Sequence, residues 1–483
     1  MLIAVCLAAL IGAADPPPET AIAVSFEQAP AAEKKAKKDN VDQAEKPVKK
    51  PKKKKTPKES KPAPDADEPV DAEADADGRG WAFSWKQHPS ARYGDIFRID
   101  LEAKLQEDGH SSYGPVAGLS TWEFHRNRFG VKGYLTKHVE YEIEHEFTEN
   151  ELTEKDIALG RTPKSRWKDV NVNLTYFKGA QIQIGKFKVP FGLDELTGVT
   201  HNDFVYRSLG ANYLAPGRDI GGMVHGEFFK HGLGYSVGAF DQDGDNAKST
   251  KIAGGGHTFA ARLTAVPFRR LSASSLGGIG VGTAFAISQL SDDPYRPNGL
   301  RGRTVMTKDT FFESVYVKGH RRRWEADADW TAGPVSARSE FTWLSDDRLS
   351  QGLGDQNLPD ARARSWYVSG TWVLTGEDKQ RPVKAAAPFA RGGIGAIELA
   401  ARYERMWFDS TPVGLDEALR NPRAETILPS GDRALTLGLN WTLNRFTKVQ
   451  VNGIREHVED PQRNPVPNGA AFWSRVIRLQ IVL

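Results

Sequence analysis

Basic side chains recur at alternate positions of segments whose other positions are mainly apolar, and they are the residues best suited to a chemical role. They are Arg98, Arg126, Arg128, Lys132, Arg262, Arg323, Arg338, Arg402 and Arg478. A guanidinium group keeps its charge at physiological pH and binds phosphate in a forked geometry. A file of such groups would lower the entry barrier for anions, whereas any single one could instead form an ion pair with a neighbouring Asp or Glu.

Motifs for catalysis and for metal binding are weak. The acidic stretch 241–246 resembles a calcium loop, but its sixth position is not Gly and its twelfth, Ile252, is not Glu, so we expect a polar turn. The glycines of 278–282 alternate at strand period with no helix pattern after them, which indicates small residues facing inward. No HExxH pair or nucleophile elbow occurs. We therefore predict no enzyme, no cofactor and no metal site; a hydrolase with distant Ser and His residues is the alternative.

The elements that must position these residues show a period of two. Alternation begins after Trp81 and continues to the end of the chain, for example in 97–105, 139–147, 324–330 and 435–443. In 97–105 the odd positions are all apolar and the even positions are all charged. Such a pattern is typical of strands with one apolar and one polar face.

A closed membrane barrel and a soluble sandwich both fit this alternation, and strand length and aromatic residues favour the barrel. The predicted strands run to about 9–12 residues, which suits a tilted strand that crosses a bilayer. Aromatic residues fall near their ends, as interfacial girdles require. These are Trp122, Phe124, Tyr176, Phe177, Trp330, Trp343, Trp366 and Trp473. Because backbone groups in lipid must all be paired, the sheet has to close.

The predicted fold class is therefore all-β, a transmembrane antiparallel β-barrel of about sixteen strands over residues 81–483. A barrel of this size encloses water, and its charged face would line the lumen. The mean hydropathy of -0.50 and the lack of a long apolar run exclude a helical membrane bundle. Apart from Cys6, the chain has no cysteine, so it has no disulfide.

The N-terminal part has a different composition. Residues 1–14 resemble a signal peptide, although the usual positive charges at its start are missing. Residues 15–80 form a Lys/Pro-rich and then acidic segment, which we predict to be a disordered periplasmic linker. Thirteen lysines in 34–61 leave two alternatives open, a solvated spacer and an electrostatic contact with the cell wall. The other 403 residues hold 51 basic and 47 acidic side chains, so neither part resembles a nucleic-acid binder.

Five motifs after about residue 95 are similar to those of a known family. They are FHRNRFGVKG (124–133), GKFKVPFGLDELT (185–197), APGRDIG (215–221), GAIELAARYE (395–404) and LTLGLNWTLN (435–444). Through these motifs the chain resembles the phosphate-selective porin O and P family of outer-membrane channels. The terminal strand looks like the recognition signal of outer-membrane proteins, although it ends in Leu483 where the family has Phe.

This resemblance implies a sixteen-stranded barrel, usually trimeric, with an inward-folded third loop that narrows the pore. By position, the loop would lie within Phe191–Asp219, and the family's paired arginines fall on His125 and Arg126, with Arg128 following. His125 departs from the family, which weakens the expectation of strong phosphate selectivity. The cations available around the loop are Lys188, Arg207 and Arg218.

Together these observations predict an outer-membrane channel for passive diffusion of small solutes, with a preference for anions such as phosphate or polyphosphate. Its expected partners are small anions, outer-membrane lipid and two further copies of the chain. One alternative is a structural protein that tethers the envelope through its lysine-rich arm. Another is a channel for neutral solutes or sugars with little ion preference.

Overall fold

The protein is described here from a computed structural model. The described residues are 80–85, 88–113, 121–148, 165–177, 179–229, 231–245, 256–269, 275–290, 297–410, 421–460, 466 and 469–483. The predicted leader at 1–14 and, apart from Gly80, the predicted linker at 15–80 lie outside these residues. Both remain predictions.

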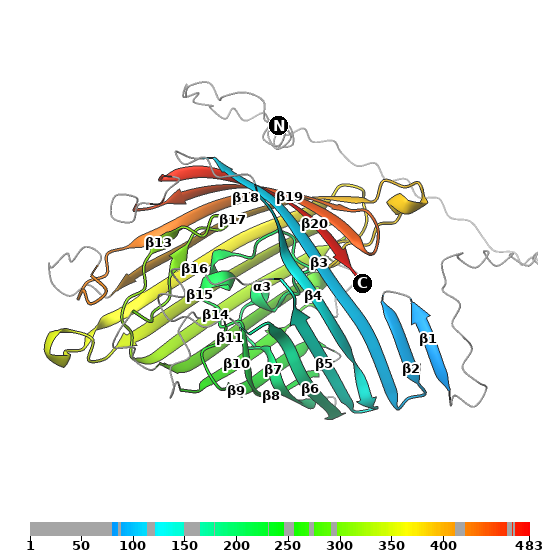
Figure 1. The fold of residues 1–483 in the computed structure, drawn as a ribbon, viewed down its shortest axis with the longest axis horizontal. Helices are drawn as coiled ribbons and strands as arrows, with labels where there is room; N and C mark the ends of the chain where they lie inside the picture. The colour runs from blue at the N-terminus through cyan, green and yellow to red at the C-terminus, as the bar shows by residue number, and fades with distance from the viewer. Residues whose placement is uncertain are drawn as a thin grey trace, which may run out of the picture. The chain divides into compact units, whose positions relative to one another are not determined.

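Strands make up most of the described chain (Figure 1). They are β1 (Trp81–Trp85), β2 (Pro89–Tyr93), β3 (Phe97–Tyr113), β4 (Thr121–Thr136), β5 (Val139–Glu146), β6 (Trp167–Phe177), β7 (Ala180–Lys188), β8 (Arg218–Phe228), β9 (Leu233–Phe240), β10 (Thr258–Ala265), β11 (Ile279–Leu290), β12 (Gly302–Arg303), β13 (Thr310–Phe312), β14 (Gly319–Ala332), β15 (Val335–Arg348), β16 (Leu358–Val373), β17 (Ala396–Ser410), β18 (Ser430–Thr442), β19 (Thr447–Val458) and β20 (Ala471–Val482). Two short helices, α3 (Leu193–Leu196) and α4 (Leu209–Tyr213), follow β7. No helix among the described residues is long and apolar enough to cross a membrane.

Sixteen of the strands form a closed antiparallel barrel, which confirms the predicted fold class. Strands β3 to β11 and β14 to β20 each pair with the next, and β20 returns to pair with β3. At this seam Trp473 lies opposite Tyr113 and Val482 lies opposite Lys104. The backbone groups of the wall therefore find partners all the way round, as a sheet in lipid requires.

A hairpin that the sequence analysis did not predict extends the seam. Strands β1 and β2 pair with each other, and β2 also pairs with β3 from Phe97 to Asp100. Strand β20 pairs with the same edge of β3 from Lys104 onward. Residue Leu483 exchanges both backbone hydrogen bonds with Ala103, between these two pairings. The β1–β2 hairpin thus pairs with the part of the β3 edge that β20 does not reach.

The barrel has two unlike ends. Turns such as 137–138, 333–334 and 443–446 lie at one end, together with the β1–β2 hairpin and Leu483. Longer connections, including 189–217 and 291–318, leave from the other end. We call these the short-turn end and the long-loop end; in outer-membrane barrels the short turns face the periplasm.

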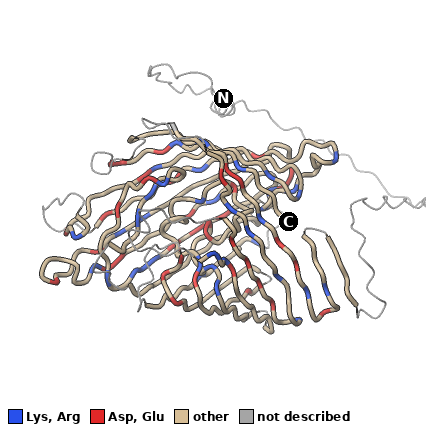
Figure 2. The backbone as a smooth tube through the Cα atoms, in the orientation of Figure 1, with Lys and Arg blue, Asp and Glu red and all other residues tan. Residues whose placement is uncertain are grey.

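The two faces of the wall follow the predicted alternation. In β3, Leu101 is 49% exposed on the outside and Asp100 is 4% exposed on the inside. In β5 the glutamates Glu144 and Glu146 are buried inside, while Ile143 faces out. Acidic and basic residues both recur along the strands around the wall (Figure 2). In β3 and β5 the outward side chains are apolar and the inward ones are charged, as predicted.

Candidate functional site

The connection between β7 and β8, residues 189–217, folds into the barrel and is called inner loop 1. It lies within the ring of strands (Figure 1) and docks on the wall across the barrel from its own strands. The amide of Leu209 donates to Glu404 (2.6 Å), and the amide of Val205 donates to Asn452 (2.8 Å). These contacts to β17 and β19 make the loop a bridge across the lumen, in the position that the family resemblance implied.

The start of inner loop 1 is shaped around α3. Gly192 has a φ of 81°, a left-handed conformation that favours glycine and turns the chain into the helix. The carboxylate of Glu340 accepts from the amide of Asp194 (2.9 Å) at the first turn. At the other end of α3, Lys188 donates to the carbonyls of Glu195 (2.5 Å) and Thr197 (3.1 Å). Charged side chains therefore form hydrogen bonds with the free backbone groups at both ends of this one-turn helix.

A second connection, residues 297–318, also folds inward and is called inner loop 2. The ring of Phe312 stacks on Phe408 of β17 at 4.2 Å between centroids, and Phe311 is fully buried beside it. These side chains belong to a core that includes Leu209 of inner loop 1 and Val476 of β20. The prediction of a water-filled, charged lumen is thus wrong for this part of the interior. Several inward positions near the long-loop end carry large apolar side chains instead of charges.

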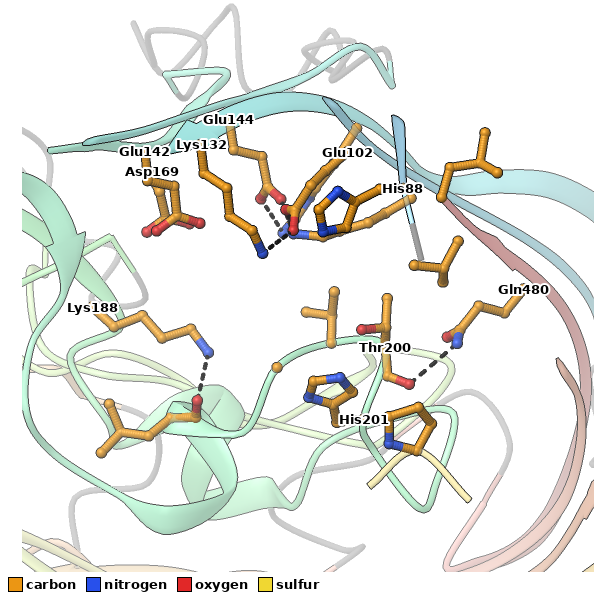
Figure 3. A pocket seen from close by; sticks show the side chains of 18 of the residues that line it. His88, Glu102, Lys132, Glu142, Glu144, Asp169, Lys188, Thr200, His201 and Gln480 are labelled. Carbon is orange, nitrogen blue, oxygen red and sulfur yellow. Dashed lines mark hydrogen bonds and ion pairs between the residues drawn. The ribbon is translucent and has the colours of Figure 1, made fainter. Parts of the chain in front are cut away.

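A cavity of about 720 Å³ lies at the short-turn end, between the wall and inner loop 1. We call it the vestibule (Figure 3). Lys132 reaches Glu102 on one side, while His201 and Thr200 of inner loop 1 lie on the other. Nine Lys or Arg side chains line the vestibule against four Asp or Glu side chains. The lining therefore holds more basic than acidic side chains, although Glu146, Glu325 and Asp327 behind it pair with two of the basic ones.

A first group of the predicted cations holds inner loop 1. Arg402 donates to the carbonyls of Tyr206 (3.1 Å) and Arg207 (3.3 Å), and Arg478 donates to that of Val205 (2.8 Å). Arg207 lies in the loop itself and donates to Asp194 (2.9 Å) and Thr197 (2.5 Å) carbonyls. These arginines, like Lys188, fix the loop.

Arg338 has a smaller share in holding the loop. It donates to the Thr197 hydroxyl (3.2 Å), while its Nε has no hydrogen-bond partner among the described residues.

A second group forms ion pairs along the wall. Arg128 pairs with Glu146 (2.6 Å) and Glu144 (3.0 Å), and Arg218 pairs with Asp169 (2.7 Å). The remaining pairs are Arg98 with Asp100 (2.9 Å), Lys132 with Glu102, and Arg262 with Glu325 (2.8 Å) and Asp327 (2.5 Å). Pairing with an inward Asp or Glu is the alternative that the sequence analysis had left open for each residue.

One predicted cation, Arg126, has no carboxylate partner among the described residues, and neither has Lys308, which the sequence analysis did not single out. Arg126 of β4 donates to the side chain of Gln106 (2.6 Å), and Lys308 of inner loop 2 donates to the carbonyl of Val305 (2.5 Å). Within the described part of the chain, neither cation forms an ion pair. The Nζ of Lys308 lies 4.8 Å from the ring centroid of Tyr206, and His125 packs against the same ring at 5.9 Å. Two cations without an ion-pair partner among the described residues thus lie near the Tyr206 ring of inner loop 1.

The comparison with known proteins decides the family. The sequence model of the family "Phosphate-selective porin O and P" matches residues 111–482. The chain belongs to this family. Porin O of Pseudomonas aeruginosa is 23% identical to this porin over 424 residues, which cover 80% of this chain and 88% of the relative.

Solved porin structures resemble this porin at lower identity. The trimer form of OmpT from Vibrio cholerae is 12% identical, with a TM-score of 0.49 and coverage of 80% of this chain and 100% of that one. The anion-selective porin from Comamonas acidovorans is 11% identical, with a TM-score of 0.47 and coverage of 80% and 99%. From its family and its barrel, this porin is an outer-membrane channel protein.

Several interior residues of the porin were missed by the sequence analysis. Lys308 lies outside the regular strands, where the alternation gives no signal. Burial lowers its pKa to about 8, and the nearby Arg303 and Arg126 act in the same direction, against Glu456.

A second missed contact involves the predicted polar turn. Asp243 binds Arg321 (2.5 Å) and Arg323 (3.0 Å). Although burial opposes it, these two arginines hold the pKa of Asp243 well below its usual range. The motif that resembled a calcium loop therefore uses its central carboxylate for two arginines of β14.

Proposed function

We propose that this porin conducts small anions in preference to cations, with phosphate and phosphate-containing solutes as the substrate class. The observation that supports this most directly is the pair of unpartnered cations, Arg126 and Lys308, at the meeting point of the two inner loops. A cation without a carboxylate attracts an anion more strongly than one already paired, because the positive potential around it is not cancelled.

The lining of the vestibule also supports a preference for anions. An anion that passes the two cations would next meet a lining with more Lys and Arg than Asp and Glu, including Lys188 and Lys448. Both donate to backbone carbonyls of inner loop 1 instead of forming ion pairs with described residues. Several weak cationic contacts in series favour entry and still allow release.

A selectivity measurement tests the proposal. The purified porin is inserted in a planar bilayer, and the reversal potential is recorded under a KCl gradient. We expect a potential of the sign that anion preference gives. In the Arg126→Gln/Lys308→Gln variant we expect the permeability ratio of anion to cation to fall by about threefold or more, since two positive charges without ion-pair partners among the described residues are removed.

The matched control removes two positive charges outside the lumen. Arg269 and Arg391 are exposed in connections at the short-turn end and do not line the vestibule. Arg269→Gln/Arg391→Gln should keep the wild-type reversal potential. A wild-type channel that prefers cations, or equal effects of the two variants, would contradict the proposal.

The assembly and the N-terminal arm belong to the same proposal. We expect a homotrimer, as the family resemblance implies, and a periplasmic position for residues 15–80, because the described chain begins at the short-turn end. The mass of the detergent-solubilised porin tests the first, and protease access in intact cells tests the second. Contact of 34–61 with the cell wall stays a prediction, testable by pull-down with and without 15–80.

A further inference from the structure

Six arginines lie on the outer face of the wall, on five consecutive strands near the long-loop end. They are called the arginine belt and consist of Arg362, Arg364, Arg405, Arg433, Arg455 and Arg475. In each strand the positions on either side of these arginines are buried inside, so the arginines occupy the outward positions. A run of charges on the lipid-facing side of a membrane barrel is costly unless something polar meets it.

The strand register places the belt residues beside one another. Arg405 lies directly opposite Arg433, and Arg455 lies opposite Trp473, two residues before Arg475. On the next pair of strands, Arg364 lies opposite Trp407. Like charges directly opposite in a sheet repel, so the belt requires negative charge nearby.

The carboxylates of the described residues meet only part of this requirement. Asp409 pairs with Arg364 (2.7 Å), and Glu459 pairs with both Arg405 and Arg433 (2.7 Å each). Among the described residues, Arg362 and Arg455 form no ion pair. Among the described residues, two carboxylates therefore serve three arginines, and two further guanidinium groups have no ion-pair partner.

The belt lies at one border of the apolar band. From Arg433 toward the short-turn end, the outward residues of β18 are Leu435, Leu437, Leu439 and Trp441. This stretch spans about 20 Å along the barrel axis, close to the height of an outer-membrane apolar band. The belt therefore lies at the level of lipid headgroups on the long-loop side.

The belt also has the geometry to bind headgroups. The side chains of Arg405 and Arg433 are 36% and 46% exposed, so their remaining donors are accessible. Arg405 stacks over Trp407 at 4.4 Å and Arg455 lies 5.8 Å from the centroid of Trp473, which holds both side chains along the surface. Adjacent arginines held in this way can bind phosphate oxygens in pairs.

We propose that the arginine belt binds the phosphate groups of an anionic membrane lipid, a phosphorylated glycolipid of the leaflet at the long-loop side. The ligand is the lipid headgroup and not free phosphate, because the belt borders the band where the acyl chains would lie. A second copy of this chain is less suited, since it would need an acidic surface to oppose the belt. The inference depends on the membrane barrel and is independent of the ion preference of the lumen.

Native mass spectrometry of the full-length porin tests the site. The probes are lipid A with two phosphates, lipid A with its phosphates removed, and inorganic phosphate. We expect the wild type to retain the bisphosphorylated lipid about tenfold more tightly than the dephosphorylated one, the scale of a few arginine–phosphate contacts. The Arg362→Gln/Arg455→Gln variant should lose most of this difference, and Arg269→Gln/Arg391→Gln should keep it.

Each other outcome overturns the proposal. Equal retention of both lipids by the wild type contradicts it without any variant, so the test holds even if the belt variant fails to fold. Full competition by millimolar inorganic phosphate would show a free-anion site in place of a lipid site. A variant that changes the number of chains in the assembly but not lipid retention would show an interface between copies.

Discussion

At the scale of single residues, the interior cations of this porin divide by their partners and not by their positions along the strands. Arg262 and Arg126 both occupy inward positions, yet Arg262 lies between Glu325 and Asp327, whereas Arg126 donates to the amide side chain of Gln106 and pairs with no described carboxylate. Gly282 leaves the space in which Arg262 reaches its two carboxylates, because a Cβ at this position would come within 2.7 Å of the Arg262 guanidinium.

This division limits what the sequence could predict about the site. The alternation correctly assigned Arg126, Arg402 and Arg478 to the inside, since the parity of a strand position is a local property. Which of them keeps a free charge depends on residues far away in the sequence. Arg478, for example, is paired with Asp108, which lies 370 residues earlier in the sequence.

The buried amine of Lys308 predicts a pH dependence. Its pKa is lowered by burial to about 8, so the amine is charged below this pH and loses its proton as the pH rises through it. Anion preference should therefore decrease between pH 7 and about 9 and approach that of Lys308→Gln, measured as the reversal potential at each pH. Lys308→Arg keeps its charge over this range and should show no such decrease. A decrease of the same size in Lys308→Arg would mean that another group titrates.

At the scale of elements, the strands were predictable and the inward loops were not. In a wall strand, a few adjacent residues are enough to show which side chains face outward, as in β18, where Leu435, Leu437 and Leu439 face out. Inner loop 1 was placed by family resemblance alone. Inner loop 2 was missed because its partners, such as Met406 and Phe408, share the inward parity of Arg402 and give no separate signal. The β1–β2 hairpin was missed because Pro89–Tyr93 has no clear alternation.

At the seam between β20 and β3, one side chain both closes the barrel and holds inner loop 1, so we expect a change there to affect both. Arg478 of β20 binds Asp108 of β3 through two hydrogen bonds of 2.6 Å and also holds the carbonyl of Val205. Arg478→Met removes the guanidinium partner of the buried Asp108 carboxylate and leaves it with His125 at 3.4 Å, which should destabilise the porin by about 3 kcal/mol. The expected result is a lower midpoint of unfolding by circular dichroism and a noisier single-channel current.

The double variant supplies the control for this coupling. Asp108→Asn/Arg478→Met removes both charges, so it should recover most of the lost stability. Its current should stay noisy, because the carbonyl of Val205 still lacks the donor that Arg478 supplied. If the double variant is no more stable than Arg478→Met, the buried charge is not the cause of the loss.

At the scale of the whole molecule, the barrel is filled unevenly along its axis. The inner loops and apolar residues such as Phe472 and Val476 form a core in one part of the lumen, and the vestibule lies at the short-turn end. The passage for solutes is therefore set by how the loops pack and not by the diameter of a sixteen-stranded wall. Because this packing joins segments from many strands, it becomes visible only in the folded structure.

Inner loop 2 offers a direct test of this arrangement. Asn298 and Val317 bind each other through two hydrogen bonds of 3.0 Å, so the chain between them can be replaced by two glycines without moving the wall. We expect this deletion of 299–316 to raise the single-channel conductance about twofold or more, since it empties part of the lumen. Phe312→Ala keeps the loop but loosens its packing on Phe408, so it should give a smaller rise with larger fluctuations. Unchanged conductance in the deletion variant would mean that inner loop 1 alone limits the current, because the wall is common to both proteins.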